Sequence, residues 1–206
     1  MIEKIREIFN NEASAIKNIP VTRRFEEAVG LIYKQVHGKN GKLVTSGMGK
    51  AGQIAHNIAT TFSSTGTPSI FLHPSEAQHG DLGILQKDDI LLAISNSGKT
   101  REIIELIELK NNLYPEIPVI VITGNENSPL AKKADCYILT GAPAEVCLLG
   151  LTPTTSTTVM TVIGDALVVL MMGKVNFTIR DYAVRHHGGY LGRKSREISD
   201  HEEPEM

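Results

Sequence analysis

The sequence is poor in cysteine: Cys136 and Cys147 are the two cysteines among its 206 residues. They form no CxxC pair and define no disulfide framework, which argues against the class of small disulfide-stabilised secreted domains. Two small, partly buried apolar side chains are the simpler interpretation of both positions. We therefore expect a protein of the reducing cytoplasm.

Excess charge of one sign and long apolar runs are also missing. The chain has 21 basic and 23 acidic residues, for a formal net charge of -2, and no long basic run, which argues against nucleic acid as the main partner. The N-terminal segment MIEKIREIFNNEASAIK is charged throughout, so we expect no signal peptide. The longest apolar stretch, Val159–Val175, contains Asp165 and Lys174, which favours a core or subunit-interface helix over a membrane span.

The most informative stretch is Ile90–Glu102. Its first five residues are apolar without alternation, which is typical of a strand buried on both faces. A Ser-Asn-Ser-Gly loop follows, and apolar residues then recur at helical spacing. A helix N-terminus after such a loop offers unpaired N–H groups, and the hydroxyls of Ser95, Ser97 and Thr100 add further donors. The stretch therefore predicts a phosphate-binding loop.

Strand and helix patterns alternate along most of the chain. Two amphipathic helices are expected within residues 1–40, before any strand. Strands are expected at 42–46, 68–73, 89–95, 118–123 and 136–140, with helices between them and a long helix at 154–172. This alternation predicts an α/β fold in one domain: a three-layer, doubly wound sheet of five mainly parallel strands. Residues 41–194 would hold the sheet core and a catalytic C-terminal segment, and 195–206 an acidic tail.

Ligands of such sheets bind beyond the carboxyl ends of the strands. Two loops there carry Ser/Gly chemistry, Ser46–Lys50 and Ser95–Thr100. If the strands that lead into them are neighbours, the two loops face one crevice.

Both loops also resemble nucleotide-binding motifs. Gly47, Gly49 and Gly52 fit a dinucleotide fingerprint, but the second strand ends in His73-Pro74 rather than in the expected acidic residue. The segment AISNSGKT matches a permissive P-loop, but no apolar strand ends in an aspartate that could hold Mg²⁺. We therefore disfavour both interpretations.

Two further motifs contain histidine. His79 and Asp81 follow a strand among small residues, which fits an acid/base pair, although from this motif alone a turn cap at His79 and a helix cap at Asp81 are the favoured explanation. His186 and His187 are adjacent, and adjacent side chains do not converge on one metal ion, so we assign no metal site there.

Taken together, these stretches resemble the sugar isomerase (SIS) domain, and within it the arabinose 5-phosphate isomerases of Kdo biosynthesis. The resemblance extends over about Gly41–Lys194 and depends on SGMGKAG, ATTFSSTGTPSIFLHPSEAQHGDLG, AISNSGKTREI, LGLTPTTSTTVMTVIGDAL and FTIRDYAVRHHGGYLGRK. It implies a parallel five-stranded sheet, a dimer or homotetramer with active sites at subunit interfaces, and interconversion of D-arabinose 5-phosphate and D-ribulose 5-phosphate. The reaction passes through an enediol and needs no cofactor and no metal.

The resemblance also implies a set of site residues. The phosphate would be bound by Ser95, Ser97 and Thr100, with Asn96 beside them, and Ser46, Gly47 and Lys50 would line the same pocket. The catalytic positions that match are Lys50, His79, Glu102 and His186. Glu102 would shuttle the C–H proton, His186 or His79 would open the ring, and Lys50 would stabilise negative charge. Without the resemblance, Glu102 is a surface carboxylate at a favourable helix N-terminus. Zinc could bind His79 or His186 and inhibit.

The chain departs from the family pattern in three ways. Lys99 stands where many members have Glu, and His187 where many have Pro, which loosens the loop of His186. Many relatives continue into a pair of CBS modules, whereas this chain ends at Met206, so we expect a catalytic domain alone. Feedback by CMP-Kdo would then act at the active-site cleft. Two alternatives stay open: a non-catalytic sugar-phosphate-binding module, and an isomerase for another phosphosugar. The product would serve lipopolysaccharide or capsule.

Overall fold

The computed structural model describes residues 1–202, with side chains described as far as residue 199. Its strands form one five-stranded sheet in the order β2-β1-β3-β4-β5, and all four pairings are parallel. The strands are β1 (Leu43–Gly47), β2 (Ser69–Phe71), β3 (Ile90–Ile94), β4 (Val119–Thr123) and β5 (Cys136–Leu139). The predicted α/β class and the five strands are thus confirmed.

The helices expected from the sequence are present in the predicted order, and α4, α8 and α9 are additional to them. They are α1 (Ile2–Lys17), α2 (Arg24–Ile32), α3 (Gly49–Ser64), α4 (Pro74–Ala77), α5 (Arg101–Leu113), α6 (Pro129–Lys133), α7 (Thr155–Lys174), α8 (Ile179–Ala183) and α9 (Gly189–Glu202). The second N-terminal helix continues from α2 into a π-helical turn, Tyr33–His37. The polar stretch after β2 contains the short helix α4 and a 3₁₀ turn, Asp81–Ile84. Residues 195–202 of the expected acidic tail form the end of helix α9. Residues 203–206 lie outside the described residues.

The apolar strand runs explain the three layers. Because successive side chains of a strand point to opposite faces, Leu92 and Ile94 pack on one side with α2, α3 and α7. Leu91 and Ala93 pack on the other side with α5. Every residue of β3 is fully buried, as the absence of alternation predicted.

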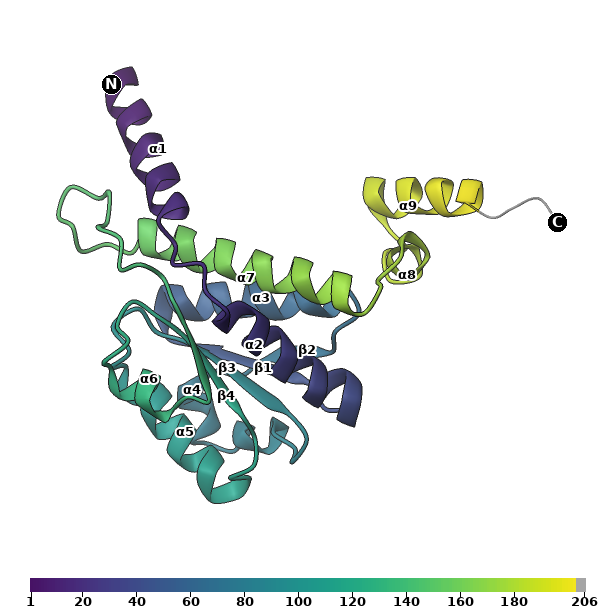
Figure 1. Ribbon diagram of the computed structural model, residues 1–206, viewed down its shortest axis with the longest axis horizontal. Helices are drawn as coiled ribbons and strands as arrows, with labels where there is room; N and C mark the ends of the chain where they lie inside the picture. The colour runs from purple at the N-terminus through teal and green to yellow at the C-terminus, as the bar shows by residue number, and fades with distance from the viewer. Residues whose placement is uncertain (203–206) are drawn as a thin grey trace.

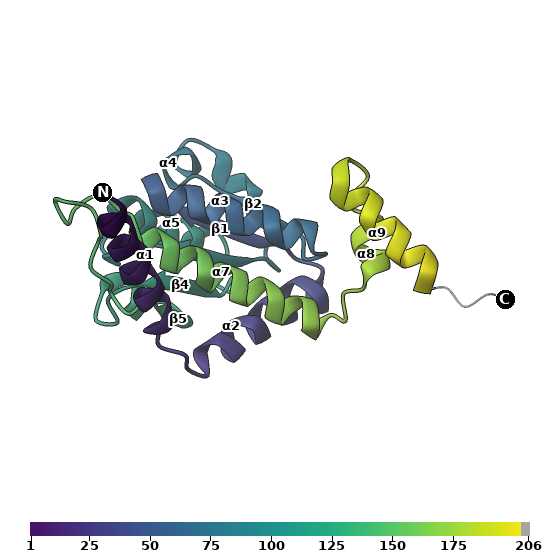
Figure 2. The ribbon, with the colours of Figure 1, turned by 90° about the horizontal axis from the view of Figure 1, so that it is seen from above.

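Helix α7 is long and apolar enough to cross a membrane by length and composition alone, but 44% of its most apolar window is buried within the protein. Its inner face joins the core through Val159, Ile163 and Leu167, and Gly164 lets it lie close to Ile58 of α3. Figure 2 shows α3, α7 and α2 side by side over the sheet. This packing agrees with the core helix expected for the apolar stretch Val159–Val175.

Two segments extend from the body at opposite ends of α7. Figure 1 shows α1 rising at the end where α7 begins and α8–α9 rising where α7 ends. Helix α1 has no buried residue, although Ile2, Ile5 and Phe9 give it apolar side chains. Of the two predicted N-terminal helices, α2 therefore packs on the sheet and α1 projects from it.

Candidate active site at the carboxyl edge of the sheet

The strand order places the two Ser/Gly loops together. Strands β1 and β3 are paired neighbours, and the chain winds outward from them in opposite directions, to β2 on one side and to β4 and β5 on the other. A sheet of this type opens a crevice at that point, beyond the carboxyl ends of the strands. A cavity of about 530 Å³ lies there, lined by Lys50 from the first loop and by Ser95, Asn96, Ser97 and Thr100 from the second. The expectation that both loops face one crevice is confirmed.

The second loop is internally braced at the start of helix α5. The buried Ser95 hydroxyl lies 2.7 Å from the hydroxyl of Thr100, which is the N-cap residue of the helix. The Ser95 oxygen also accepts the Gly98 N–H at 3.1 Å, and the Lys99 N–H donates to the Ser97 oxygen at 3.2 Å. Gly98 has a φ of +63°, a left-handed conformation that favours glycine. Hydroxyls and first-turn N–H groups of a helix therefore meet at the cavity wall, which suits an anion.

Lys50 adds positive charge to the lining of the same cavity. It lies in the first turn of α3, its side chain is exposed, and it forms no ion pair with any described residue. An ammonium group that has no ion pair among the described residues, at a cavity whose hydroxyls suit an anion, is available to a substrate oxygen.

Glu145 is a cavity residue that the sequence analysis missed. It comes from the loop between β5 and α7, and its Oε2 accepts hydrogen bonds from the Thr154 N–H at 2.7 Å, the Thr154 hydroxyl at 2.9 Å and the Ser156 N–H at 3.3 Å. Burial opposes its ionisation, but these hydrogen bonds from Ser156 and Thr154 outweigh burial and lower the pKa of Glu145. A carboxylate thus faces the cavity, held at the N-terminus of α7. The available signal was an acidic residue in a loop that leaves the carboxyl end of a strand.

Two of the expected pocket residues lie elsewhere. Ser46 is fully buried, and its hydroxyl donates to the Leu72 carbonyl at 2.7 Å instead of lining the cavity. All of β1 is buried, Ser46 included, and this hydrogen bond holds the side chain inside the protein, which corrects the prediction. Gly47 lines a neighbouring cavity of about 350 Å³ with His56 and His73. Its role there is steric, because a Cβ at Gly47 would lie 2.8 Å from the Ala51 carbonyl.

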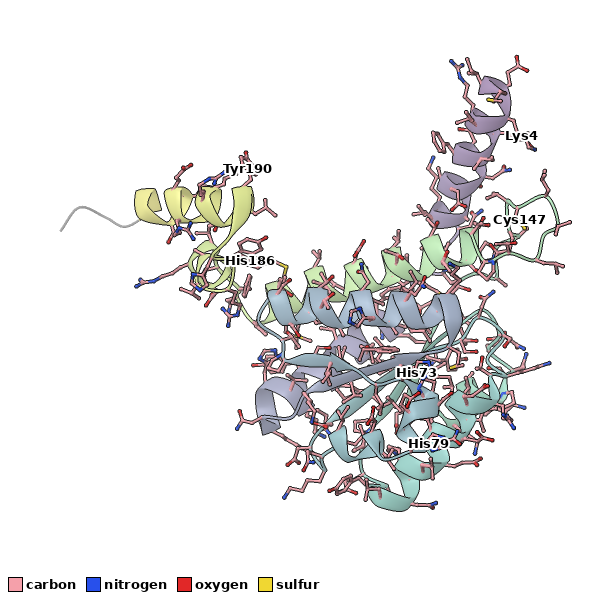
Figure 3. The ribbon with its side chains drawn as sticks, turned by 180° about the vertical axis from the view of Figure 1, so that it is seen from behind. Lys4, His73, His79, Cys147, His186 and Tyr190 are labelled. Atoms are coloured by element: carbon pink, nitrogen blue, oxygen red, sulfur yellow. The ribbon has the colours of Figure 1, made fainter. Side chains whose placement is uncertain are left out.

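Three of the four expected catalytic residues do not reach the cavity within one chain. His79 is exposed after α4, and Glu102, half-buried in the first turn of α5, is not among the lining residues. His186 lies between α8 and α9, where Nδ1 is 2.9 Å from the Tyr182 carbonyl and the two rings stack at 3.7 Å. Figure 3 shows His186 on the projecting arm, away from His79 in the body. Among the described residues of a single chain, the cavity is therefore lined by Lys50 and Glu145 but by no histidine.

No metal cluster is evident in the part of the chain that the structure describes: three or more His, Cys, Asp or Glu side chains nowhere converge there. The chemistry that the described residues bring to the cavity is therefore that of hydroxyls, N–H groups, one ammonium and one carboxylate.

Comparisons with known proteins agree with this geometry. The SIS domain family model matches residues 37–170. Arabinose 5-phosphate isomerase KdsD of Shigella flexneri is 50% identical over 154 residues, which are 75% of this chain and 46% of that protein. The chain thus spans about half the length of the curated relatives it matches.

Two solved structures are similar over almost the whole chain. A crystal structure from Bacteroides fragilis, of a proposed phosphosugar isomerase involved in capsule formation, has a TM-score of 0.91 and 68% identity, and covers 92% of this chain and 99% of that one. Protein c3406 of Escherichia coli CFT073, in complex with arabinose 5-phosphate, has a TM-score of 0.81 and 37% identity, and covers 90% and 96%.

Proposed function

The chain belongs to the SIS domain family, and we propose that it is an aldose–ketose isomerase that interconverts D-arabinose 5-phosphate and D-ribulose 5-phosphate. The observation that carries the proposal is the 530 Å³ cavity lined by the Ser95–Thr100 loop, with its hydroxyl and N–H donors, and by Lys50 and Glu145. The relatives named for this activity and the neighbour in complex with arabinose 5-phosphate support the choice of substrate.

In the proposed reaction, each of these cavity groups has a role. Ser95, Ser97 and Thr100 hold the phosphate, so that the other end of the open-chain sugar lies toward Lys50. A carboxylate takes the proton from C2 of the aldose, and the carbonyl oxygen O1 gains a proton as the enediol forms. Return of a proton to C1, with loss of the O2 proton, leaves the ketose. The Lys50 ammonium stabilises the negative charge that develops on the oxygens.

Two carboxylates compete for the proton-shuttle role. The family resemblance favours Glu102, whereas the cavity of one chain is lined by Glu145. The matched variants Glu102→Gln and Glu145→Gln separate them, because the shuttle variant loses turnover and keeps its affinity for the sugar phosphate. Near-normal turnover in Glu102→Gln would remove the base role from that residue.

We assign ring opening to His79 or His186, which requires a second copy of the chain. The α8–α9 arm holds His186 away from its own body, so a dimer or homotetramer with shared sites would bring it to the cavity of a partner. Mixing Lys50→Met and His186→Ala chains, each expected to turn over more slowly on its own, tests this. Shared sites predict recovered turnover in the mixture, since some sites then contain both native residues; independent sites predict none.

The remaining expectations form part of the same proposal. The protein would act in the cytoplasm, its product would feed Kdo synthesis for lipopolysaccharide or capsule, and CMP-Kdo would bind at the cleft as a feedback ligand. If saturating CMP-Kdo neither inhibits nor shifts the melting temperature, feedback at the cleft is wrong. A panel of phosphosugars compared by kcat/KM decides between this substrate and another, and turnover of none of them would leave a sugar-phosphate-binding module.

A further inference from the structure

The phosphate loop, defined as Ser95–Thr100, is held from behind by the segment that joins β4 to α6. The Asn96 carbonyl accepts the Gly124 N–H at 2.9 Å and the Thr123 hydroxyl at 3.3 Å. The Gly98 carbonyl accepts the Leu130 N–H at 3.2 Å. None of these three donor residues lines the 530 Å³ cavity. We call these three donor residues, Thr123, Gly124 and Leu130, the brace. The brace therefore lies on the side of the loop that faces away from the ligand.

The fit between the brace and the loop is close. A Cβ at Gly98 would collide with the side-chain oxygen of Ser128 and would lie 2.9 Å from that of Thr123. Ser128 is fully buried and fixed, because its oxygen caps α6 by accepting the Ala131 N–H at 3.2 Å. Thr123 is fully buried as well. The loop thus has little freedom to move toward β4.

Peptide geometry links the brace to the ligand. In a trans peptide the carbonyl and the following N–H point in opposite directions, and the described chain contains no cis peptide. Because the Asn96 carbonyl points at Thr123 and Gly124, the Ser97 N–H points to the cavity side. This N–H has no acceptor among the described residues, so it is free to bind an anion.

We propose that Thr123 is a positioning residue for phosphate recognition. Its oxygen accepts the Asn125 N–H at 3.3 Å, and its hydroxyl proton goes to the Asn96 carbonyl. Together with the Gly124 N–H, the hydroxyl thereby fixes the peptide whose N–H meets the phosphate. The inference rests on the proposed function in that the ligand is a phosphate ester, and it adds a residue that does not touch the ligand.

The test compares three variants. Thr123→Val keeps the shape of the side chain and removes the hydroxyl, and Thr123→Ser keeps the hydroxyl. Thr67→Val is the matched control, because Thr67 is fully buried, its oxygen lies 3.1 Å from Nε2 of His37, and it does not line the cavity. Calorimetry measures the affinity for inorganic phosphate, and steady-state assays measure KM and kcat for D-arabinose 5-phosphate.

For Thr123→Val we expect the Kd for phosphate and the KM to rise about three- to tenfold, as for the loss of one hydrogen bond, with kcat within about twofold of the wild type. Thr123→Ser should restore both values. Thr67→Val should lower the melting temperature and leave phosphate affinity unchanged. The proposal is overturned if Thr123→Val has a lower melting temperature but binds phosphate like the wild type. It is also overturned if kcat falls while the Kd for phosphate and the KM stay unchanged.

The two failures can be told apart. A wild-type protein that binds phosphate and isomerises no phosphosugar contradicts the proposed function, and phosphate affinity still decides the role of Thr123. A wild-type protein that binds no phosphate overturns both.

Discussion

The two edges of the sheet differ in how their polar groups are paired. At the amino edge, the buried Asp89 accepts the N–H groups of Lys42 at 2.9 Å and Gln86 at 2.8 Å and forms an ion pair with the Lys42 ammonium at 2.7 Å. At the carboxyl edge, the Ser97 side chain is exposed and lines a cavity. The Asp89 carboxylate at the amino edge is used within the fold, whereas the exposed Ser97 side chain at the carboxyl edge is open to a ligand.

Two lysines show the same difference in one residue type. Lys110 is 2% exposed, and its ammonium donates to the carbonyls of Ile117 at 2.7 Å and Pro115 at 3.4 Å, closing the turn before β4. Lys50 is exposed and forms no ion pair with the described residues. We therefore expect Lys110 to matter for stability and Lys50 for turnover.

The largest effect is expected at Asp89. Asp89→Ala leaves the Lys42 and Gln86 N–H groups unpaired and the ion pair broken, so it should lower the free energy of unfolding by about 3–5 kcal/mol. Urea unfolding measures the loss, and Asp88→Ala, next in sequence and only half-buried, is the control. Folded Asp89→Ala should keep the kcat of the wild type. If Asp89→Ala lowers the free energy of unfolding by less than Asp88→Ala does, the proposed difference between the two edges of the sheet is wrong.

Lys50→Met tests the opposite edge. Removing a charge that acts on the reacting oxygens should lower kcat/KM by about 10²-fold, with no change in melting temperature because the side chain is exposed and unpaired. Lys99→Met is the matched control, an exposed lysine of the phosphate loop, and should raise KM by a few-fold. A melting temperature that falls with Lys50→Met and turnover that persists would reverse the assignment.

Lys110→Met is the counterpart of that variant. The apolar side chain fills similar space but leaves the Ile117 and Pro115 carbonyls unpaired, which should cost about 1–3 kcal/mol of unfolding free energy. The kcat should stay within about twofold, since Lys110 is remote from the cavity. Lys87→Met, at an exposed position before β3, should leave stability unchanged. Equal stability of the two variants would show that the buried hydrogen bonds contribute nothing.

The sequence predicted well what depends on neighbouring residues. Each expected strand lies within two residues of its observed bounds, since an apolar run between turn residues defines a buried parallel strand. The phosphate loop and Lys50 could be placed because each directly follows such a strand. Both features need only local sequence and the rule that ligands bind at the carboxyl edge.

The rest depends on packing that the pattern does not contain. Glu145 reaches the cavity because the loop after β5 folds back onto the start of α7, a contact set by tertiary structure. The Ser46 hydroxyl is bound to the Leu72 carbonyl inside the protein, against the expectation from its Ser/Gly loop. The direction of the arm that carries His186 follows from no periodic pattern in its sequence.

The smallest effect concerns the cysteines, which also fall on the two edges. Cys136 opens β5 at the amino edge, where burial and the nearby Glu27 raise the pKa of its thiol to about 11. Cys147 lies in the loop beyond the carboxyl edge (Figure 3). Partial desolvation opposes ionisation of its thiol, but N–H donors outweigh it and lower the pKa, with Thr152 at 3.1 Å and Leu151 at 3.2 Å from the sulfur.

Because the thiolate is the reactive form, a maleimide at about pH 8 should modify Cys147 in the folded protein and leave Cys136 intact until unfolding. The rate of Cys147 modification should rise with pH and reach its plateau at a pH below the ordinary pKa of a thiol. This is expected because the lowered pKa lets the Cys147 thiolate form at lower pH. Peptide mass spectrometry locates the label. The Cys147→Ser variant should not be labelled, and it should keep the stability of the wild type and a kcat within about twofold of it. Modification of Cys136 first would contradict both the burial at the amino edge and the open character of the carboxyl edge.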